Sequence, residues 1–291
     1  MSAWLGRVLI ALIESLHGWS QPARTRLANA IGDALWWLVR PRRRVALANL
    51  RACFPHWSEE QRRRVARDCF RHMARAALDH AVLARATREQ IARFVRAEGL
   101  QHLLDPANRP LIMIAPHFVG LNAGGIRIAS EVAAASIYAR QRNRALDDWL
   151  RAIRGRFNEP VLIAREGFDL RAAIRAMKAG RPFYYLPDQD YGAQHSIFVP
   201  FFGVPAATIP MVARLARLTG ARVLMTVTEM TPDGYVLHVE PPWEDFPSAS
   251  LEQDTARMNR EIERWVQKMP AQYLWLHKRF KSRPPGAAPI Y

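Results

Sequence analysis

The chain has 291 residues, with 42 lysines and arginines against 26 aspartates and glutamates, and a formal charge of +16. A hydrophobic content of 49% with 23% charged residues is typical of globular proteins, which excludes a disordered or fibrous chain. The positive charge predicts anionic partners, either nucleic acid, phosphate-bearing lipid or an acidic protein. The two cysteines, Cys53 and Cys69, exclude a disulfide scaffold and a cysteine-rich zinc site.

Two apolar segments lie within the first 44 residues, and we expect both to associate with a membrane. On a helix, Arg7 and Glu14 would share one face while Trp4 and other apolar residues lie opposite, as in interfacial helices. The second segment carries Trp36 and Trp37 between arginine clusters, which fits an anionic cytoplasmic leaflet. The alternative is that both segments are ordinary core helices with cationic ends.

Helical signals dominate residues 1–104. The sequence from Ser58 to Gln61 is a capping box, which predicts a helix from there to about Ala84. Arginines recur along this helix and are partly neutralised by two aspartates, so we expect a solvated, salt-bridged face rather than a binding stripe. The residues concerned are Arg64, Arg67, Arg71, Arg75, Asp68 and Asp79.

From residue 110 onward, short apolar or aromatic runs alternate with helical windows. This alternation predicts an α/β fold with a central, mostly parallel sheet and helices on both faces. The expected strands cover residues 111–115, 135–138, 161–163, 183–186, 222–230 and 235–240. The expected helices cover residues 120–132, 145–157, 168–179, 209–218 and 251–269. Residues 282–291 are rich in proline and small residues and are expected to form a loose tail.

One block, residues 115–125, combines a histidine with several glycines. His117 follows directly after the first apolar strand, where α/β sheets place their sites. The chain contains no GxGxxG, GxxxxGK[ST], GxSxG or HExxH motif, which argues against nucleotide-binding folds, elbow-type serine hydrolases and HExxH zinc proteases.

Several segments together carry a family resemblance. They are His117-Phe-Val-Gly-Leu-Asn122, the sequence Leu-Pro-Asp-Gln-Asp-Tyr-Gly at 186–192, residues 198–203, and residues 272–281. In this order they resemble the bacterial lipid A biosynthesis acyltransferases of the late lauroyl/myristoyl type, within the wider glycerolipid acyltransferase group. The resemblance covers nearly the whole chain.

The resemblance implies membrane-associated helices over residues 1–44 and an acyltransferase domain over residues 45–281. It implies transfer of a fatty acyl chain from acyl-acyl carrier protein to a hydroxyl of a lipid A precursor, at the cytoplasmic face of a bacterial inner membrane. The implied partners are acyl carrier protein, the lipid A precursor and anionic membrane lipids, and nucleic acid is not among them. No cofactor is implied besides the acyl-carrier co-substrate, and no metal.

The family signature is His, four residues, then Asp or Glu, and it implies that His117 is the general base. An acidic partner would hold the imidazole, but position 122 is Asn, which carries no charge. Three explanations are open: a change introduced to inactivate the protein, a natural feature of a low-activity relative, or transfer of the role to Asp188 or Asp190. We favour the first, and on that interpretation Asn122→Asp should raise acyl transfer by orders of magnitude.

The remaining candidates are expected to bind substrate. An oxyanion needs a donor, and backbone amides near Gly120 or an arginine would serve. Substrate phosphates favour bidentate arginines. The acids of the Leu186–Gly192 block would orient an arginine or a sugar hydroxyl. The residues are Gly120, Arg140, Arg165, Asp188, Asp190 and Arg279.

Three rival interpretations stay open. The first is a glycerolipid or lysophosphatidate acyltransferase of the same group. The second is a non-catalytic or inactivated lipid-binding form, suggested by Asn122. The third, a nucleic-acid-binding protein, rests on charge alone.

Overall fold

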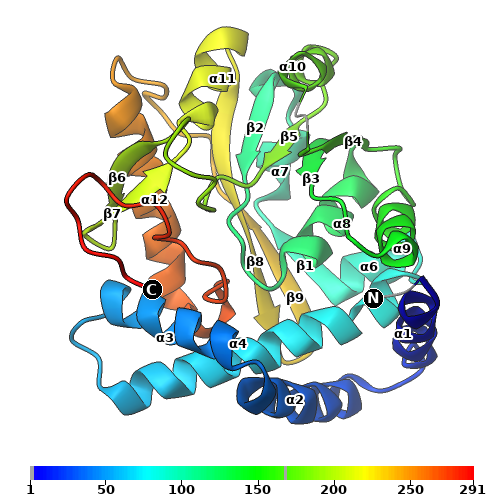
Figure 1. Ribbon diagram of the computed structural model, residues 1–291. Helices are drawn as coiled ribbons and strands as arrows, with labels where there is room; N and C mark the ends of the chain where they lie inside the picture. The colour runs from blue at the N-terminus through cyan, green and yellow to red at the C-terminus, as the bar shows by residue number, and fades with distance from the viewer. Residues whose placement is uncertain (1–2, 167–168) are drawn as a thin grey trace.

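The computed structural model describes residues 3–166 and 169–291. A twisted sheet lies in the middle, helices pack against both of its faces, and the N-terminal helices lie across one end of it (Figure 1). The expected start of a helix at Phe168 lies outside the described residues.

The main sheet has seven strands in the order β1-β9-β8-β2-β5-β3-β4. Every neighbouring pair is parallel except β8 and β9, which are antiparallel. The strands are β1 (Val95–Glu98), β2 (Leu111–Ile114), β3 (Ala135–Tyr138), β4 (Val161–Ala164), β5 (Phe183–Tyr185), β8 (Arg222–Thr231) and β9 (Gly234–Val239). The predicted α/β class with a mostly parallel sheet is therefore confirmed.

Strand β2 shows that both faces of the sheet are covered. All four of its residues are buried, which requires packing on each side. Leu111 and Met113 belong to one apolar cluster, and Ile112 and Ile114 to another. The first cluster includes residues of α6 (Arg88–Phe94), α7 (Leu100–Leu104), α8 (Leu121–Glu131) and α9 (Arg144–Arg154). The second includes residues of α10 (Leu170–Lys178), α11 (Met211–Thr219) and α12 (Leu251–Lys268).

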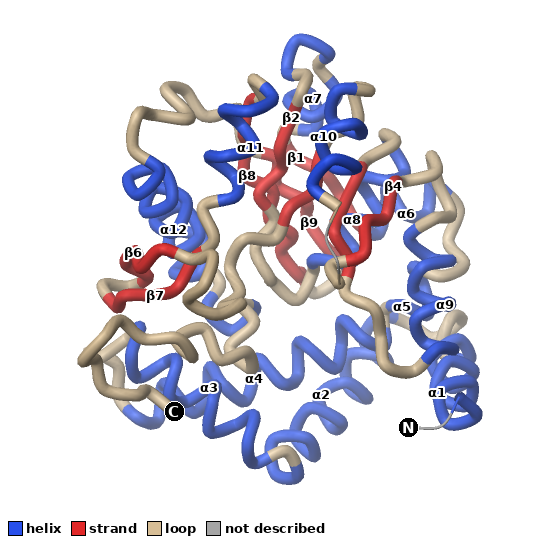
Figure 2. Tube along the Cα trace, turned by 45° about the horizontal axis from the view of Figure 1, so that its top comes forward, coloured by secondary structure: helices blue, strands red, loops and turns tan. Residues whose placement is uncertain are grey.

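The first five helices of the described chain form a layer beneath the sheet, which Figure 2 shows from a second angle. They are α1 (Ala3–Ser15), α2 (Gln21–Leu38), α3 (Arg40–Cys53), α4 (Glu59–Leu78) and α5 (His80–Leu83). Helix α4 begins as predicted, since the Ser58 hydroxyl accepts from the Gln61 backbone N–H at 3.1 Å. The helix expected to reach Ala84 is split at Asp79 into α4 and α5.

The basic face of α4 is salt-bridged, as expected, but much of its neutralisation comes from another helix. Asp33 of α2 binds Arg67 at 2.7 Å and Arg71 at 2.8 Å, and Asp68 of α4 binds Arg71 at 3.0 Å. These contacts help to fix α2 along α4.

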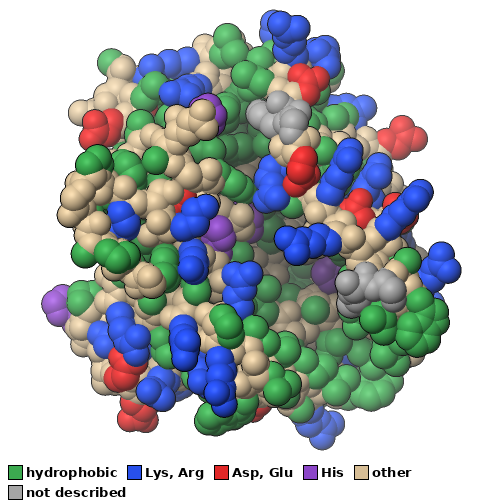
Figure 3. All heavy atoms as spheres, in the orientation of Figure 1, with side chains coloured by type: hydrophobic (Ala, Val, Ile, Leu, Met, Phe, Trp, Pro, Cys, Tyr) green, Lys and Arg blue, Asp and Glu red, His purple; other side chains and the backbone are tan. Residues whose placement is uncertain are grey.

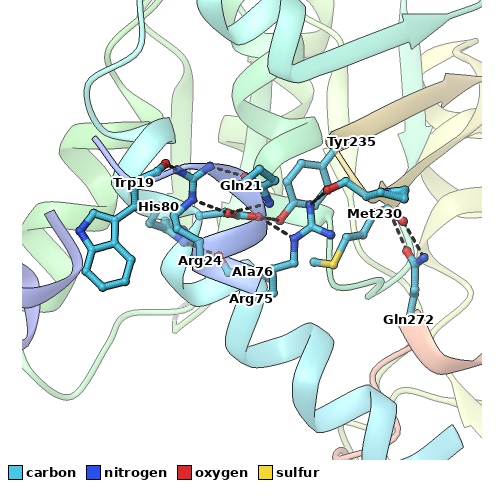
Figure 4. A network of polar contacts seen from close by, with 11 residues as sticks. Trp19, Gln21, Arg24, Arg75, Ala76, His80, Met230, Tyr235 and Gln272 are labelled. Carbon is cyan, nitrogen blue, oxygen red and sulfur yellow. Dashed lines mark hydrogen bonds and ion pairs between the residues drawn. The ribbon is translucent and has the colours of Figure 1, made fainter. Parts of the chain in front are cut away.

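A buried ionic network joins the N-terminal layer to the sheet (Figure 4). The carboxylate of Asp79 is fully buried and accepts hydrogen bonds from the Arg24 guanidinium at 3.3 Å and the Tyr235 hydroxyl at 2.9 Å. Arg75 completes the network with an ion pair at 3.4 Å. Because the partners come from α2, α4 and β9, one carboxylate ties three elements together.

Apolar side chains are left exposed on the N-terminal layer. Trp4 and Leu12 of α1 are 67% and 61% exposed, and Trp37 of α2 is 66% exposed. Within residues 3–166 and 169–291, no helix has both the length and the apolar character needed to cross a bilayer.

Other parts of the chain differ from the expectation. Strand β1 lies in a region expected to be helical, and its sequence Val-Arg-Ala-Glu gives little strand signal because only one residue is a strongly apolar β-former. A separate antiparallel hairpin of β6 (Ile197–Phe201) and β7 (Val204–Thr208) was also not predicted.

The C-terminal tail, expected to be loose, makes specific contacts with the body of the protein. The hydroxyl of Tyr291 accepts from the Phe280 backbone N–H at 3.1 Å and is also hydrogen-bonded to Asn49. Ser282 donates to the buried Asp190 through its backbone N–H at 2.6 Å and its hydroxyl at 2.9 Å. These contacts hold residues 282–291 against the sequence block that contains Asp190.

Candidate active site

The candidate site forms where two parallel strands end side by side. Two residues separate His117 from the end of β2, and two residues separate Asp188 from the end of β5. Strands β2 and β5 pair directly, with Ile114 opposite Tyr185. Because the carboxyl ends of parallel strands meet at one edge of a sheet, the loops after β2 and β5 converge.

His117 and Asp188 are held together by two hydrogen bonds. The His117 Nδ1 lies 2.7 Å from Asp188 Oδ1, and the His117 backbone N–H donates to Oδ2 at 2.9 Å. Since the carboxylate accepts a hydrogen bond from the Nδ1–H, the imidazole presents Nε2 as its free basic nitrogen. The pairing fixes both the tautomer and the direction of the ring.

Asp188 is ionised although it is only 2% exposed. Burial alone would raise its pKa, but the charge of His117, the two hydrogen bonds from that residue and the charge of Arg279 lower its pKa to about 2. A buried carboxylate is thus present to stabilise a protonated imidazole.

The C-terminal motif forms the other wall of this site. The Val119 N–H donates to the Gln272 carbonyl at 2.8 Å, and the Leu274 N–H donates to the His117 carbonyl at 3.0 Å. Tyr273 is buried, and burial followed by the negative charge of Asp188 raises the pKa of its phenol well above the usual range. Segments more than 150 residues apart in sequence therefore fix the histidine loop.

Two cavities meet at His117. The first, of about 210 Å³, lies between α8 and strands β3 and β4, and the second, of about 330 Å³, lies toward α11. Both are lined mainly by apolar and aromatic residues, and His117, Ile137, Ala139 and Leu186 belong to both linings. Figure 3 shows a hollow near the middle of this face with histidine side chains beside it. The free face of the imidazole thus lies between two apolar compartments.

Comparison with known proteins gives the family. A sequence profile described as bacterial lipid A biosynthesis acyltransferase matches residues 1–282. The chain belongs to the bacterial lipid A biosynthesis acyltransferase family.

Relatives within the lipid A acyltransferases match over nearly their full length. The lipid A biosynthesis lauroyltransferase of Escherichia coli K12 is 32% identical over 294 residues, covering 99% of this chain and 94% of the relative. The myristoyltransferase of the same organism is 32% identical over 295 residues, covering 99% and 90%. These relatives support an acyltransferase.

A solved structure was also matched. The 1-acyl-sn-glycerophosphate acyltransferase of Thermotoga maritima aligns over 87% of this chain and 99% of its own, with 16% sequence identity and a TM-score of 0.39.

Asn122, at the position where the resemblance implies an acid, is not what holds His117 here. Asn122 lies at the start of α8, and its Oδ1 accepts from Arg154 Nη2 at 2.8 Å. The structure thus pairs His117 with Asp188 and Asn122 with Arg154. Of the three explanations for Asn122, this geometry favours the third, in which another acid takes the role. The first explanation, a change introduced to inactivate the protein, stays a prediction.

Asp190 and Arg279, both expected to bind substrate, are buried within the protein. Asp190 accepts the hydrogen bonds from Ser282 and one from the Gly192 N–H at 2.9 Å. The Arg279 guanidinium donates to the Ala207 carbonyl and the Thr208 hydroxyl, both at 2.8 Å, and the residue is only 2% exposed. Arg279 therefore acts on Asp188 through its charge and is not open to a substrate phosphate.

The two other arginines expected to bind substrate, Arg140 and Arg165, are exposed. Arg165 lines the second cavity, where it pairs with Glu166 at 3.0 Å and lies 5.7 Å from the ring of Tyr191. Arg140 is exposed in the loop after β3. Of these two arginines, Arg165 lines a cavity that reaches the histidine, and Arg140 does not.

Gly120 is required by packing. A Cβ at this position would lie 2.5 Å from the Thr228 carbonyl oxygen of β8, so no other residue fits without a shift. The same close approach of α8 to β8 occurs at Gly124, whose added Cβ would lie 2.0 Å from the Thr228 hydroxyl. These glycines allow α8, and the loop before it, to lie directly on the sheet.

Two residues near the site were not predicted to act there. Arg154 lines the first cavity, and burial lowers the pKa of its guanidinium. No motif marks it in the sequence. His277, read as structural, accepts from the Asp190 N–H at 3.2 Å, and burial followed by the charges of His117 and Arg279 lowers its pKa to about 4.

Proposed function

We propose that this protein transfers a fatty acyl chain from acyl-acyl carrier protein to a hydroxyl of a lipid A precursor, with His117 as general base and Asp188 as its partner. The observation that carries the proposal is the His117–Asp188 pair on a wall shared by two apolar cavities. Family membership supplies the reaction class.

The proposed chemistry follows from the free Nε2 of His117. As the acceptor hydroxyl oxygen attacks the thioester carbon, Nε2 takes its proton, and Asp188 stabilises the imidazolium that forms. The tetrahedral intermediate then breaks its C–S bond, and the imidazolium returns the proton to the departing thiolate. An ester is formed, a thiol is released, and His117 is again neutral.

Two cavities suit a reaction between two lipid chains. The donor brings an acyl chain, and the acceptor brings a hydroxyl on a chain of its own. With apolar linings on either side of the imidazole, both chains can be shielded from water while their reactive atoms meet at Nε2. Exclusion of water also limits hydrolysis of the thioester.

The oxyanion donor we propose is the Gly120 backbone N–H. Within the described residues, the other four backbone N–H groups of the segment His117–Leu121 already donate to acceptors in the protein. The Gly120 N–H, one residue before α8, is the donor of this segment that is left for a substrate.

The site of action we propose is the cytoplasmic face of a bacterial inner membrane. Exposed Trp4, Leu12 and Trp37 on the N-terminal layer would enter the interface, and the formal charge of +16 suits anionic lipids and an acidic carrier protein. Figure 3 shows basic side chains over α3 and apolar side chains over α1 at the same end of the molecule.

The test is an acyl-transfer assay with purified protein, acyl-acyl carrier protein and a lipid A precursor, read by mass spectrometry. We expect the precursor to gain one acyl chain as the carrier thiol is released, and His117→Ala to abolish the gain. Acylation of lysophosphatidate instead would favour the glycerolipid alternative. Substrate binding without turnover would favour the non-catalytic alternative.

A further inference from the structure

A second cavity of a different kind lies in the N-terminal layer, away from His117. Its volume is about 260 Å³, and it shares no lining residue with the two cavities at the histidine. The lining comes from α2, α3 and α4, and consists of Trp36, Trp37, Arg43, Arg44, Leu47, Arg51 and Arg63. We refer to it as the Trp-Arg pocket.

Positive charge in the Trp-Arg pocket is not neutralised by its walls. Four lining residues are arginines and none is acidic. Arg51 binds Glu59 at 2.5 Å, so its charge is balanced from outside the pocket. Arg44 and Arg63 have no hydrogen bond or ion pair in the part of the chain that the structure describes. Two guanidinium groups are thus available to an anion.

Aromatic rings hold a third guanidinium in place. Arg43 lies 5.3 Å from the ring centroid of Trp36 and 5.5 Å from that of Trp37, and its Nη1 donates to the Trp36 carbonyl at 3.3 Å. Stacking and hydrogen bonding order this side chain before any ligand arrives. The pocket is therefore partly preorganised.

The neighbouring cavity provides an internal comparison. It shares Trp36 and Arg63 with the Trp-Arg pocket and is also rich in arginine, but its walls include Glu60 and Asp68. Arg67 and Arg71 on that side bind Asp33. The arginines that follow Arg63 along α4 are therefore paired with carboxylates. The lack of acidic residues is thus specific to the Trp-Arg pocket and is not shared by the cavity beside it.

We propose that the Trp-Arg pocket binds the phosphate group of a membrane lipid. Forked guanidinium groups match phosphate oxygens. Beside them, Trp37 and Leu38 are 66% and 77% exposed, and these side chains suit the acyl region next to a lipid headgroup. A phosphate with an attached acyl chain would contact both the guanidinium groups and the exposed apolar side chains. Free phosphate would contact only the guanidinium groups, and an acidic protein would not need the apolar side chains.

Occupation of this pocket would orient the catalytic site toward the membrane. Helix α3 contributes Arg43 and Arg44 near its start, and its Asn49 donates to the carbonyls of Trp275 at 2.8 Å and His277 at 2.7 Å. One helix thus joins the lipid-binding pocket to the motif beside His117. This orienting role rests on the proposed function, whereas lipid binding itself does not.

The test compares binding to vesicles of phosphatidylcholine alone and of phosphatidylcholine mixed with phosphatidylglycerol, by co-sedimentation. The variant is Arg44→Gln/Arg63→Gln. The matched control is Arg171→Gln/Lys178→Gln, which removes the same charge from exposed positions of α10 at the far end of the molecule (Figure 1). We expect the pocket variant to bind the mixed vesicles about 30-fold more weakly, from two surface cations, and the control to change less than about threefold. Trp37→Ala should also weaken binding.

Three results would overturn the proposal. Equal losses in both double variants would show a net-charge effect alone. Unchanged vesicle binding by the pocket variant, with loss of binding to acyl carrier protein, would assign the pocket to an acidic protein. If inorganic phosphate binds the pocket in competition with the vesicles and Trp37→Ala has no effect on vesicle binding, the pocket would be assigned to free phosphate. Thermal unfolding of each variant checks that it is folded.

Acyl transfer in detergent micelles separates this proposal from the catalytic one. His117 and Asp188 are unchanged in the pocket variant, so its turnover in micelles should equal that of the unmodified protein. Absence of turnover in the unmodified protein would overturn the proposed function and leave the vesicle comparison intact.

Discussion

Asp188 binds His117 with both of its carboxylate oxygens, one on the ring Nδ1 at 2.7 Å and one on the backbone N–H at 2.9 Å. The same acid therefore positions the side chain and the loop that carries it. Because Asp188 is buried and makes both of these hydrogen bonds, it has little freedom to leave the histidine. This arrangement gives His117, the proposed base, an acidic partner although position 122 is Asn.

Substitution at position 122 should have a small effect. In Asn122→Asp the new carboxylate would face Arg154, which already donates to this side chain at 2.8 Å. We expect the rate of acyl transfer to change less than tenfold, because the acid is added to an arginine and not to the base. The measurement is the turnover rate of the variant in the acyl-transfer assay. Asp148→Asn, at an exposed position of α9, is the control. A gain of several orders of magnitude would instead place residue 122 in the dyad.

His277 should make stability depend on pH. Its folded-state pKa is lowered to about 4, so the unfolded chain takes up a proton below the ordinary value of about 6.5 while the folded protein does not. The contribution of neutral His277 to the free energy of unfolding is therefore complete above about pH 6.5, and it is lost as the pH falls toward 4. The slope contributed by one such proton is at most about 1.4 kcal/mol per pH unit.

The variant His277→Gln should flatten the pH dependence of the unfolding free energy between about pH 4 and 6.5. Its amide oxygen can still accept from the Asp190 N–H. His72 and His80 are also buried with lowered pKa values, so some slope stays in the variant. Exposed His195→Gln is the control, and denaturant unfolding at several pH values is the measurement. Parallel curves for His277→Gln and the unmodified protein would contradict the assignment.

Gly120, just before α8, and Gly124, within it, should respond differently to the same second substitution. Gly124→Ala places a Cβ 2.0 Å from the Thr228 hydroxyl, whereas Gly120→Ala places one 2.5 Å from the Thr228 carbonyl. Each should cost about 2 kcal/mol of unfolding free energy. Adding Thr228→Ala should recover more of the loss for Gly124→Ala than for Gly120→Ala. The shortest contact of the first is with the Thr228 hydroxyl, whereas the shortest contact of the second is with backbone, and the substitution relieves only its 2.9 Å contact with Thr228 Cγ2. Equal recovery in urea unfolding would refute this packing account.

The network around Asp79 should dominate the attachment of the N-terminal layer. Asp79→Asn leaves the guanidinium groups of Arg24 and Arg75 buried without a counter-charge, so we expect a loss of about 3–5 kcal/mol. Tyr235→Phe removes one hydrogen bond and should cost about 1 kcal/mol. Denaturant unfolding measures both losses of unfolding free energy. Similar losses for the two variants would argue against a buried ionic centre.

The sequence was sufficient for the sheet and for His117. Most strands are short apolar or aromatic runs between turn signals, and the histidine follows one of them, so local patterns place both. Strand β1 escaped prediction because it is short and half charged, and its strand conformation depends on pairing with β9.

Pairing across the fold is where local patterns fail. His117 and Asp188 lie 71 residues apart, and only the adjacency of β2 and β5 brings them together. A family signature with four intervening residues pointed to position 122 instead. Arg279 shows a second limit, because a motif arginine looks the same in sequence whether it meets substrate or lies buried beside Asp188.

The most direct test compares kcat/KM for acyl transfer in Asp188→Asn and Asn122→Ala. Asp188→Asn keeps the shape of the side chain but loses its charge, and the account predicts a fall of about 10³–10⁴-fold in kcat/KM. Asn122→Ala removes a hydrogen bond to Arg154 and should fall less than tenfold. A large loss in Asn122→Ala together with near-normal activity in Asp188→Asn would contradict the assignment of Asp188 as the partner of the base.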